Sequence, residues 1–429
     1  MRPVVYQQRH RELPIDQHLR LRQSIRFARR HLHRTISPNT GAVPDTLLLE
    51  ISMHKLSLFT LAATLTFAQQ PPPAVHSPVV QTDGRITFRL LAPYAQKVSV
   101  SIEGQPSPFP MQKDEQGIWG ATSPVLTPNI YGYSFTEDGV HIIDPSNTQI
   151  KPNLLSLSNA VEVPGPAPMS WDQAAIPHGE VHHHFYHSTV VGDNRDFYVY
   201  TPPNYNPAAS VTYPVLYLLH GFSDDASGWT SVGKANLILD YLIDANLAKP
   251  MIVVMPLGYG APEILHRTGP PTSNPDLRER NIANFRTALI DEVMPAVERA
   301  YKMDTDRNSR AIAGLSMGGA ESLLTGLNRM DKFSWVGSFS AGGAGDDFAA
   351  AFPQAGEEMN QKLHLLWMAC GTEDRLIDSN RKLIAWLKSK GVTLTQIETP
   401  GMHTWMVWRN NLIHFAPLLF QKPAAQPTI

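Results

Sequence analysis

The chain has 429 residues, 42% of them hydrophobic and 17% charged, with a formal net charge of −2 at pH 7. That length is enough for two domains with sizeable cores, and the composition is that of a globular protein rather than a disordered one. The small net charge gives no reason to expect nucleic acid or an anionic membrane as a partner, and the single cysteine, Cys370, excludes an internal disulfide framework and a multi-cysteine metal site.

The N-terminal residues have the layout of a processing segment preceded by a basic leader. Residues 53–68 read "MHKLSLFTLAATLTFA", with a basic residue, an apolar stretch over Leu56–Phe67 and small residues up to Ala68. This layout predicts a secretory signal peptide cut near Ala68, and so a secreted or periplasmic protein without a stable membrane anchor. We expect Met53 to be the true start and residues 1–52 to be a wrongly assigned or disordered extension. The alternative is a basic amphipathic segment followed by a membrane anchor.

Residues 79–163 have the pattern of a small all-β module, after a Pro-rich linker at 69–78. Short alternating runs rich in β-branched and aromatic residues are separated by Gly, Pro and Asp, and no helical period appears. This pattern predicts a sandwich of antiparallel strands. The aromatic residues of these runs either bind glycan from an exposed face or fill the core; they are Trp119, Tyr131 and Tyr133.

Residues 171–422 alternate apolar strand-like runs with helical stretches. The expected strands are 195–202, 213–221, 251–256, 310–316, 335–341 and 363–371. The expected helices are 235–247, 281–301, 319–330 and 380–391. Continuous apolar strands alternating with helices predict an α/β domain with a mostly parallel sheet covered on both faces.

The stretch "RAIAGLSMGGAES" places Ser316 between two glycines, after a strand and before a helix. Strand, tight turn and helix form the arrangement that exposes a nucleophilic serine at the edge of a sheet. The N-terminus of the following helix and the Met317 N–H can stabilise negative charge beside that serine. The alternative is an ordinary serine in a Gly-rich loop.

A nucleophilic serine needs a base, and the base needs an orienting carboxylate. After the strand at 363–371 comes "TEDRLIDS", which offers Glu373, Asp374 and Asp378. After "VTLTQIETPG" comes "MHTW", which offers His403. The order serine, acid, histidine is the one found in α/β-hydrolases.

The stretch "YLLHGFSDDASGW" ends an apolar strand in His-Gly, and its Phe222 N–H is the expected partner of the Met317 N–H in an oxyanion hole. His220 precedes the nucleophile, so we expect it to be structural. Trp229 and Trp405 flank the candidate loops and either line the acyl pocket or belong to the core.

A histidine-rich run, "HGEVHHHFYH" at 178–187, raises the question of a metal site. In a strand His183 points away from His182 and His184. No Asp, Glu or Cys at ligand spacing accompanies these histidines, so we predict no metal and no cofactor.

Several short motifs of the chain resemble those of a known protein family. The matching words are "YPVLYLLHGFSDDASGW", "MIVVMPLGYG", "NFRTALIDEVMPAVERAY", "RAIAGLSMGG", "CGTEDRL" and "GMHTW", in the family's order. Residues 171–422 resemble the esterase-D-like α/β-hydrolases of carbohydrate esterase family one, which includes feruloyl and acetylxylan esterases. The resemblance implies that Ser316 is the nucleophile, Asp374 the acid and His403 the base. It also implies that Phe222 and Met317 supply the oxyanion N–H groups.

The resemblance extends to the β module and sets the functional hypothesis. Residues 79–163 are similar to the immunoglobulin-like early-set modules, related to glycogen-binding modules, that precede such esterases. We therefore predict a secreted serine esterase acting on polysaccharide-linked or small aryl and acyl esters, such as feruloyl or acetyl groups of xylan. The alternatives are an acyltransferase or another esterase, of the mycolyltransferase or enterochelin esterase type, and a binding protein without catalysis.

Overall fold

The computed structural model describes residues 74–266, 274–343, 345 and 347–421. All of them belong to one compact unit, Pro73–Ile429. The predicted extension at 1–52 and the predicted signal peptide at 53–68 lie outside the described residues, as does the first half of the linker at 69–78. None of the helices in the described ranges has the length and apolar character needed to span a bilayer.

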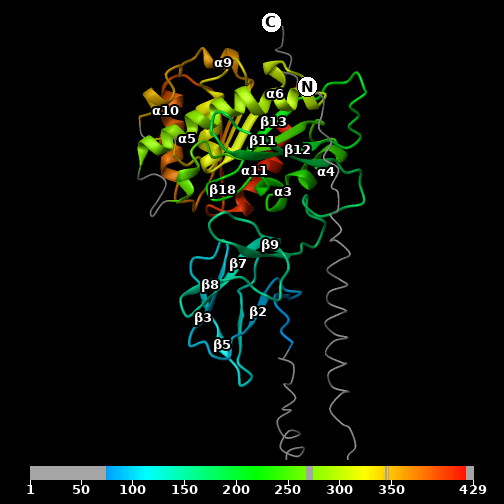
Figure 1. Ribbon diagram of the computed structural model, residues 1–429, viewed down its shortest axis with the longest axis vertical. Helices are drawn as coiled ribbons and strands as arrows, with labels where there is room; N and C mark the ends of the chain where they lie inside the picture. The colour runs from blue at the N-terminus through cyan, green and yellow to red at the C-terminus, as the bar shows by residue number, and fades with distance from the viewer. Residues whose placement is uncertain (1–73, 267–273, 344, 346, 422–429) are drawn as a thin grey trace, which may run out of the picture. The chain divides into compact units, whose positions relative to one another are not determined.

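The part of the chain from Val79 to Val163, called the β part below, folds into antiparallel strands in two sheets. The strands are β1 Val79–Val80, β2 Ile86–Leu91, β3 Val98–Ile102, β4 Phe109–Pro110, β5 Gln112–Lys113, β6 Ile118–Thr122, β7 Asn129–Glu137, β8 Val140–Ile142, β9 Ile150–Lys151 and β10 Ser158–Val163. One sheet has the order β1-β2-β6-β5; the other has the order β4-β3-β7-β10-β9, with β8 paired to β7 (Figure 1).

The inward-facing residues of the β part form a core of their own. In β2 the buried positions alternate with partly exposed ones, as expected for a strand with one face on a core. Trp119, Tyr131 and Tyr133 all lie in this core, with at most 7% of each residue exposed. These three aromatic residues therefore fill the core of the β part and do not form an exposed surface on which a glycan could stack.

From Glu180 onward the described chain forms an eight-stranded sheet with the order β11-β12-β14-β13-β15-β16-β17-β18. The strands are β11 Glu180–His187, β12 Asn194–Thr201, β13 Val215–Leu219, β14 Ile252–Pro256, β15 Arg310–Leu315, β16 Trp335–Phe339, β17 Leu365–Gly371 and β18 Thr395–Thr399. Strands β11 and β12 are antiparallel to their neighbours, and all pairs from β14 to β18 are parallel. The mostly parallel sheet that we expected is confirmed.

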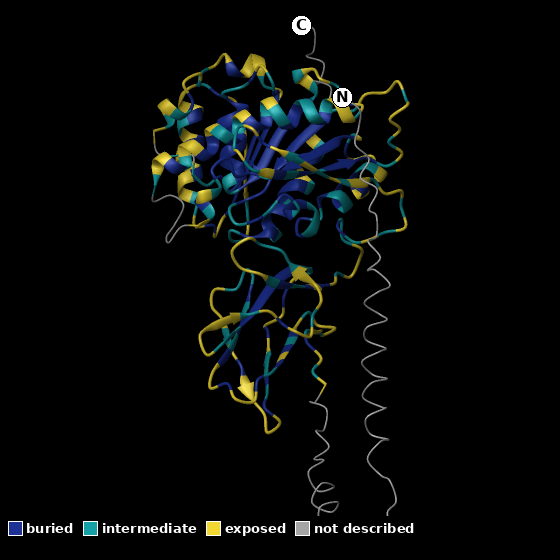
Figure 2. Cartoon of the chain, in the orientation of Figure 1, coloured by how far each residue is buried: buried dark blue, intermediate teal, exposed yellow. Residues whose placement is uncertain are grey.

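Helices cover both faces of this sheet (Figure 1). On one face lie α5 Pro275–Ala288, α6 Met294–Ala300, α7 Met317–Gly326 and α10 Ile377–Ser389. On the other lie α3 Gly228–Ser231, α4 Ala235–Asp244 and α11 Trp405–Phe415. The short helices α8 Phe348–Ala351 and α9 Met359–Lys362 follow β16. Figure 2 shows the central strands buried from end to end, which explains why they read as continuous apolar runs rather than alternating ones.

The short helices α3, α8 and α9 were not expected, and two longer helical segments also differ from expectation. Helix α11, which begins directly after Thr404, was not predicted from the sequence. The single helix expected at 281–301 begins earlier, at Pro275, where Asn274 accepts the Leu277 N–H as an N-cap. It is also interrupted by a π-helical turn, η3 Leu289–Val293.

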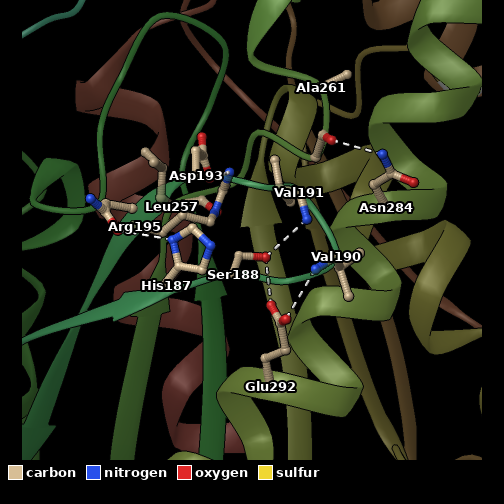
Figure 3. A network of polar contacts seen from close by, with 12 residues as sticks. His187, Ser188, Val190, Val191, Asp193, Arg195, Leu257, Ala261, Asn284 and Glu292 are labelled. Carbon is tan, nitrogen blue, oxygen red and sulfur yellow. Dashed lines mark hydrogen bonds and ion pairs between the residues drawn. The ribbon is translucent and has the colours of Figure 1, made fainter.

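The π-helical turn anchors the hairpin that joins β11 to β12 (Figure 3). Glu292 accepts hydrogen bonds from Ser188 Oγ at 2.6 Å, Thr189 N at 2.7 Å and Val190 N at 3.1 Å. Ser188 Oγ in turn accepts the Val191 N–H at 3.0 Å. One carboxylate therefore accepts from two backbone N–H groups of this turn and from the Ser188 hydroxyl.

Candidate active site

Ser316 lies at the sharp turn between β15 and α7. Its φ of 53° and ψ of −114° are in a region that residues with a side chain seldom adopt. The turn is held by hydrogen bonds from Ser316 N to Phe339 O at 2.8 Å and from Gly342 N to Ser316 O at 2.9 Å. A Cβ on Gly314 would lie 2.5 Å from Gly318 O, so this turn requires glycine there.

The structure brings Ser316, His403 and Asp374 together from three separate loops. Ser316 Oγ lies 2.9 Å from His403 Nε2, and His403 Nδ1 lies 2.8 Å from Asp374 Oδ2. Asp374 follows β17, and His403 follows β18 and precedes α11. This geometry allows His403 to accept the Ser316 proton while Asp374 holds the Nδ1–H tautomer.

Asp374 is the buried member of the three. Its side chain is fully enclosed, whereas that of His403 is 17% exposed. Burial alone would raise the pKa of Asp374, but its hydrogen bonds with His403 and with the Leu376 N–H hold that pKa below its ordinary value. The group is therefore a carboxylate at neutral pH. The neighbouring Asp378 has a side chain that is 84% exposed and pairs with Arg381.

The loop after β13 passes beside the candidate nucleophile. A Cβ on Gly221 would lie 3.4 Å from Ser316 Cβ, which brings the Gly221–Phe222 peptide next to the serine. Met317 is the first residue of α7, so its N–H is one of the free donors at the start of that helix. His220 is fully buried, and burial lowers its pKa to about 4. It is neutral at pH 7 and contacts backbone, which fits a structural role.

Trp229 and Trp405 lie in the core beneath the site. Trp229 has no exposed surface and Trp405 only 2%. Their rings meet edge to face at 5.2 Å, and Trp229 Nε1 donates to Leu219 O at 2.9 Å. These contacts favour the core alternative over that of pocket walls.

The histidines of β11 have separate partners on the two faces of the strand. His184 Nε2 lies 2.5 Å from Tyr301 Oη, and His183 Nε2 lies 2.7 Å from Asp196 Oδ2. Within the described ranges, no three His, Cys, Asp or Glu side chains are grouped so that they could hold a metal ion.

Two features near the site were missed by sequence reasoning. Trp408 lies edge-on to His403 at 4.8 Å, from the helix that the sequence did not predict. A groove of about 560 Å³ is lined in part by Arg278, Arg286, Asn328 and Gly343. Gly342, which precedes Gly343 of this groove, lies close to the candidate nucleophile, because a Cβ on Gly342 would lie 3.5 Å from Ser316 Oγ.

Comparison with known proteins adds family relationships to this geometry. Residues 188–419 match the protein family described as "Putative esterase". The chain is similar to an endo-1,4-beta-xylanase/feruloyl esterase of Xylanibacter ruminicola, with 29% identity over 356 residues. The match covers 81% of this chain and 46% of the relative, so the chain spans about half the length of that protein.

Solved structures share the fold. The ferulic acid esterase of Anaeromyces mucronatus in complex with ferulic acid is 25% identical, with a TM-score of 0.52 over 59% of this chain and 96% of that one. The enterobactin esterase of Shigella flexneri is 19% identical, with a TM-score of 0.58 over 78% of this chain and 92% of that one. The fold around the site is therefore α/β-hydrolase-like.

Proposed function

The chain belongs to this esterase family, and we propose that it is a serine esterase that removes feruloyl or acetyl groups from plant polysaccharide. The observation that carries the proposal is the chain of contacts from Ser316 Oγ through His403 to Asp374, at 2.9 and 2.8 Å. Such a chain activates a hydroxyl that is otherwise a weak nucleophile.

In the proposed reaction, Ser316 Oγ attacks the ester carbonyl carbon while its proton passes to His403 Nε2. The tetrahedral intermediate collapses, the alcohol leaves with the proton from Nε2, and an acyl-serine remains. Water then gives a proton to Nε2 and attacks the acyl carbon; the acyl–Oγ bond of the second tetrahedral intermediate breaks, Nε2 returns the proton to Ser316 Oγ, and the acid is released. Asp374 stabilises the His403 imidazolium that forms during both acylation and deacylation.

We assign the oxyanion hole to the N–H groups of Phe222 and Met317. The negative charge develops on the former carbonyl oxygen only in the transition state, so these donors would lower the barrier rather than tighten substrate binding. The start of α7 contributes further positive potential at the same point.

The proposed substrate class rests on the relatives. The Xylanibacter ruminicola relative is named as a xylanase and feruloyl esterase, and the Anaeromyces mucronatus enzyme binds ferulic acid. The likeness to the enterobactin esterase concerns the fold alone, and we keep an ester of that type as the second candidate. We also propose that the β part is an immunoglobulin-like module and that the protein is secreted.

The experiment that tests the proposal is the Ser316→Ala variant assayed with a nitrophenyl ester. We expect turnover to fall to background while the unfolding temperature stays close to that of the wild type. A matched control is Ser379→Ala, at an exposed serine of α10. Near wild-type turnover by Ser316→Ala would overturn the assignment of the nucleophile.

The acyl group is tested by a side-by-side assay of methyl ferulate, acetylated xylan and short nitrophenyl esters. A feruloyl esterase should prefer methyl ferulate, and an acetylxylan esterase should release acetate from the xylan. Acyl transfer to an added alcohol in preference to water would instead favour an acyltransferase. Failure to turn over any ester, together with retention of the chain on insoluble xylan, would favour a binding protein.

A further inference from the structure

Two segments of the β part contact the two loops that carry the proposed catalytic groups. One contact joins Glu103, directly after β3, to Trp405, which follows His403 and Thr404. The other joins Asn153 and Leu154, after β9, to Ser223 in the loop after β13. Both contacts are hydrogen bonds between residues far apart in the sequence.

The first contact caps helix α11. Glu103 Oε1 accepts the Trp405 N–H at 3.0 Å. Thr404 holds the N-cap position but makes no capping bond with its side chain, and its Oγ1 is buried without a partner in the described structure. A carboxylate at a helix N-terminus satisfies a free N–H and complements the helix dipole. The β part therefore supplies the cap that the local sequence does not.

The Glu103 carboxylate is held in place by further hydrogen bonds within the β part. Its Oε2 accepts from Lys151 Nζ at 2.9 Å and from the Gly132 N–H at 3.0 Å, and only 14% of its side chain is exposed. Burial alone would raise the pKa of Glu103, but Lys151 and the Trp405 N–H hold that pKa below its ordinary value. The acceptor is therefore ionised at neutral pH.

Helix α11 is fastened to the β part at a second point. Arg409 is fully buried and donates to Asn129 Oδ1 at 2.7 Å and to Ile130 O at 2.6 Å, both at the start of β7. Its other Nη atom donates to Val232 O at 3.0 Å, on the α/β side. The first turns of the helix that begins just after His403 are thus fixed from the β part.

The second segment supports the proposed oxyanion loop. The Leu154 N–H donates to Ser223 O at 2.7 Å, and Asn153 Nδ2 donates to Ser223 Oγ at 2.9 Å. Ser223 directly follows Phe222 and has a φ of 72°, which a serine seldom adopts without outside support. A loop in this conformation needs partners to hold it.

We propose that the β part is a positioning element of the active site, with Glu103 as the positioning residue for His403 and Asn153 as that for the Phe222 loop. This inference rests on the proposed serine esterase mechanism. Catalytic groups must be held to within about half an ångström of their productive geometry, so a small shift at the start of α11 would misplace the imidazole. The contribution of the β part to catalysis is then expected for esters of every size, including esters without a sugar.

The test uses the full chain, a small nitrophenyl ester and three variants. Glu103→Ala removes the cap, whereas Glu103→Gln keeps a carbonyl oxygen for the Trp405 N–H. Asp144→Ala is the matched control, because Asp144 is 1% exposed and bonds Tyr133 Oη and Ser146 N within the β part alone. Unfolding temperatures are recorded for all three, and assays are run well below them.

We expect Glu103→Ala to lower kcat about 10- to 100-fold with little change in KM, because a misplaced base affects the transition state more than binding. Glu103→Gln should recover most of this loss. Asp144→Ala should lower the unfolding temperature of the β part but leave kcat within about threefold of the wild type.

Three results would overturn the inference: a wild-type kcat for Glu103→Ala, equal losses for the Gln and Ala variants, or an equal loss of kcat for Asp144→Ala. The control for the underlying mechanism is Ser316→Ala in the same assay. If that variant is inactive and Glu103→Ala is fully active, the positioning role fails while the esterase assignment stands. If Ser316→Ala stays active, the mechanism itself fails.

Discussion

His220 Nδ1 donates a hydrogen bond to the carbonyl oxygen of its own neighbour, Gly221, at 2.8 Å. The tautomer follows from a second contact, because the Gly258 N–H donates to Nε2 at 2.9 Å and that nitrogen must carry a lone pair. In a trans peptide the carbonyl and the following N–H point in opposite directions. Holding the Gly221 carbonyl therefore aims the Phe222 N–H.

We predict that His220→Ala lowers kcat without a matching change in KM. The substitution frees the Gly221–Phe222 peptide to rotate, and loss of one oxyanion donor costs on the order of 10²-fold in kcat. The measurement is steady-state kinetics on a nitrophenyl ester, together with an unfolding curve. Tyr259→Phe is the milder comparison, because Tyr259 Oη reaches Gly221 O only at 3.4 Å. An unchanged kcat in a folded His220→Ala protein would contradict this role.

The same histidine predicts a pH dependence of stability. Burial lowers the pKa of His220 to about 4 in the native state, whereas an unfolded histidine titrates near 6.5. Between these values the unfolded state binds the proton and the native state does not, so acidification destabilises the protein, by up to about 3 kcal/mol from this group. Urea unfolding at about pH 7 and about pH 4.5 should show a smaller loss for His220→Gln than for the wild type. Parallel losses in the two proteins would rule out this source.

Asp374→Asn should reduce kcat by about 10⁴-fold, because an amide NH₂ facing Nδ1 favours the wrong imidazole tautomer. Asp374 is 1% exposed, and its Oδ1 accepts the Leu376 N–H at 2.8 Å, so Asn keeps the size of the group. The matched control is Asp378→Asn, at the exposed acid that follows in the sequence, and it should stay near wild-type activity. Similar losses at the two positions would leave the identity of the acid open.

The sequence predicts the strands of the α/β sheet well because each is buried on both faces. Strands such as β13 and β15 are buried at every position, so they stand out as apolar runs bounded by glycine or polar residues. In parallel strands the carboxyl ends meet at one sheet edge, and this places Ser316 near the loops with Asp374 and His403. The candidate site could therefore be predicted as an order of residues, although not as distances.

Helix α11 escaped prediction for a physical reason. Its residues pack against the sheet on one side and the β part on another, so Trp405, Trp408 and Arg409 are all buried and no clear polar face remains. Its N-terminal signal is also missing from the local sequence, because the cap comes from Glu103. Contacts between residues so far apart leave no pattern in a single sequence.

A final prediction concerns the stability of the β11–β12 hairpin, which depends on Glu292 (Figure 3). Burial alone would raise the pKa of Glu292, but its hydrogen bonds from Ser188 and Thr189 hold that pKa below its ordinary value of 4.5. The ionised carboxylate therefore contributes to the stability of the protein above pH 4.5, and this contribution is lost as the pH falls through the native pKa. Glu292→Ala should therefore destabilise the protein at pH 7 by about 2 kcal/mol, because it removes the hydrogen bonds from the Ser188 hydroxyl and from the Thr189 and Val190 N–H groups. Urea unfolding measures this loss, and it should shrink at about pH 3. Asp291→Asn, at the exposed neighbouring acid, should leave the midpoint unchanged. An equal shift for both variants would indicate a general effect of charge instead of the bonds to the hairpin.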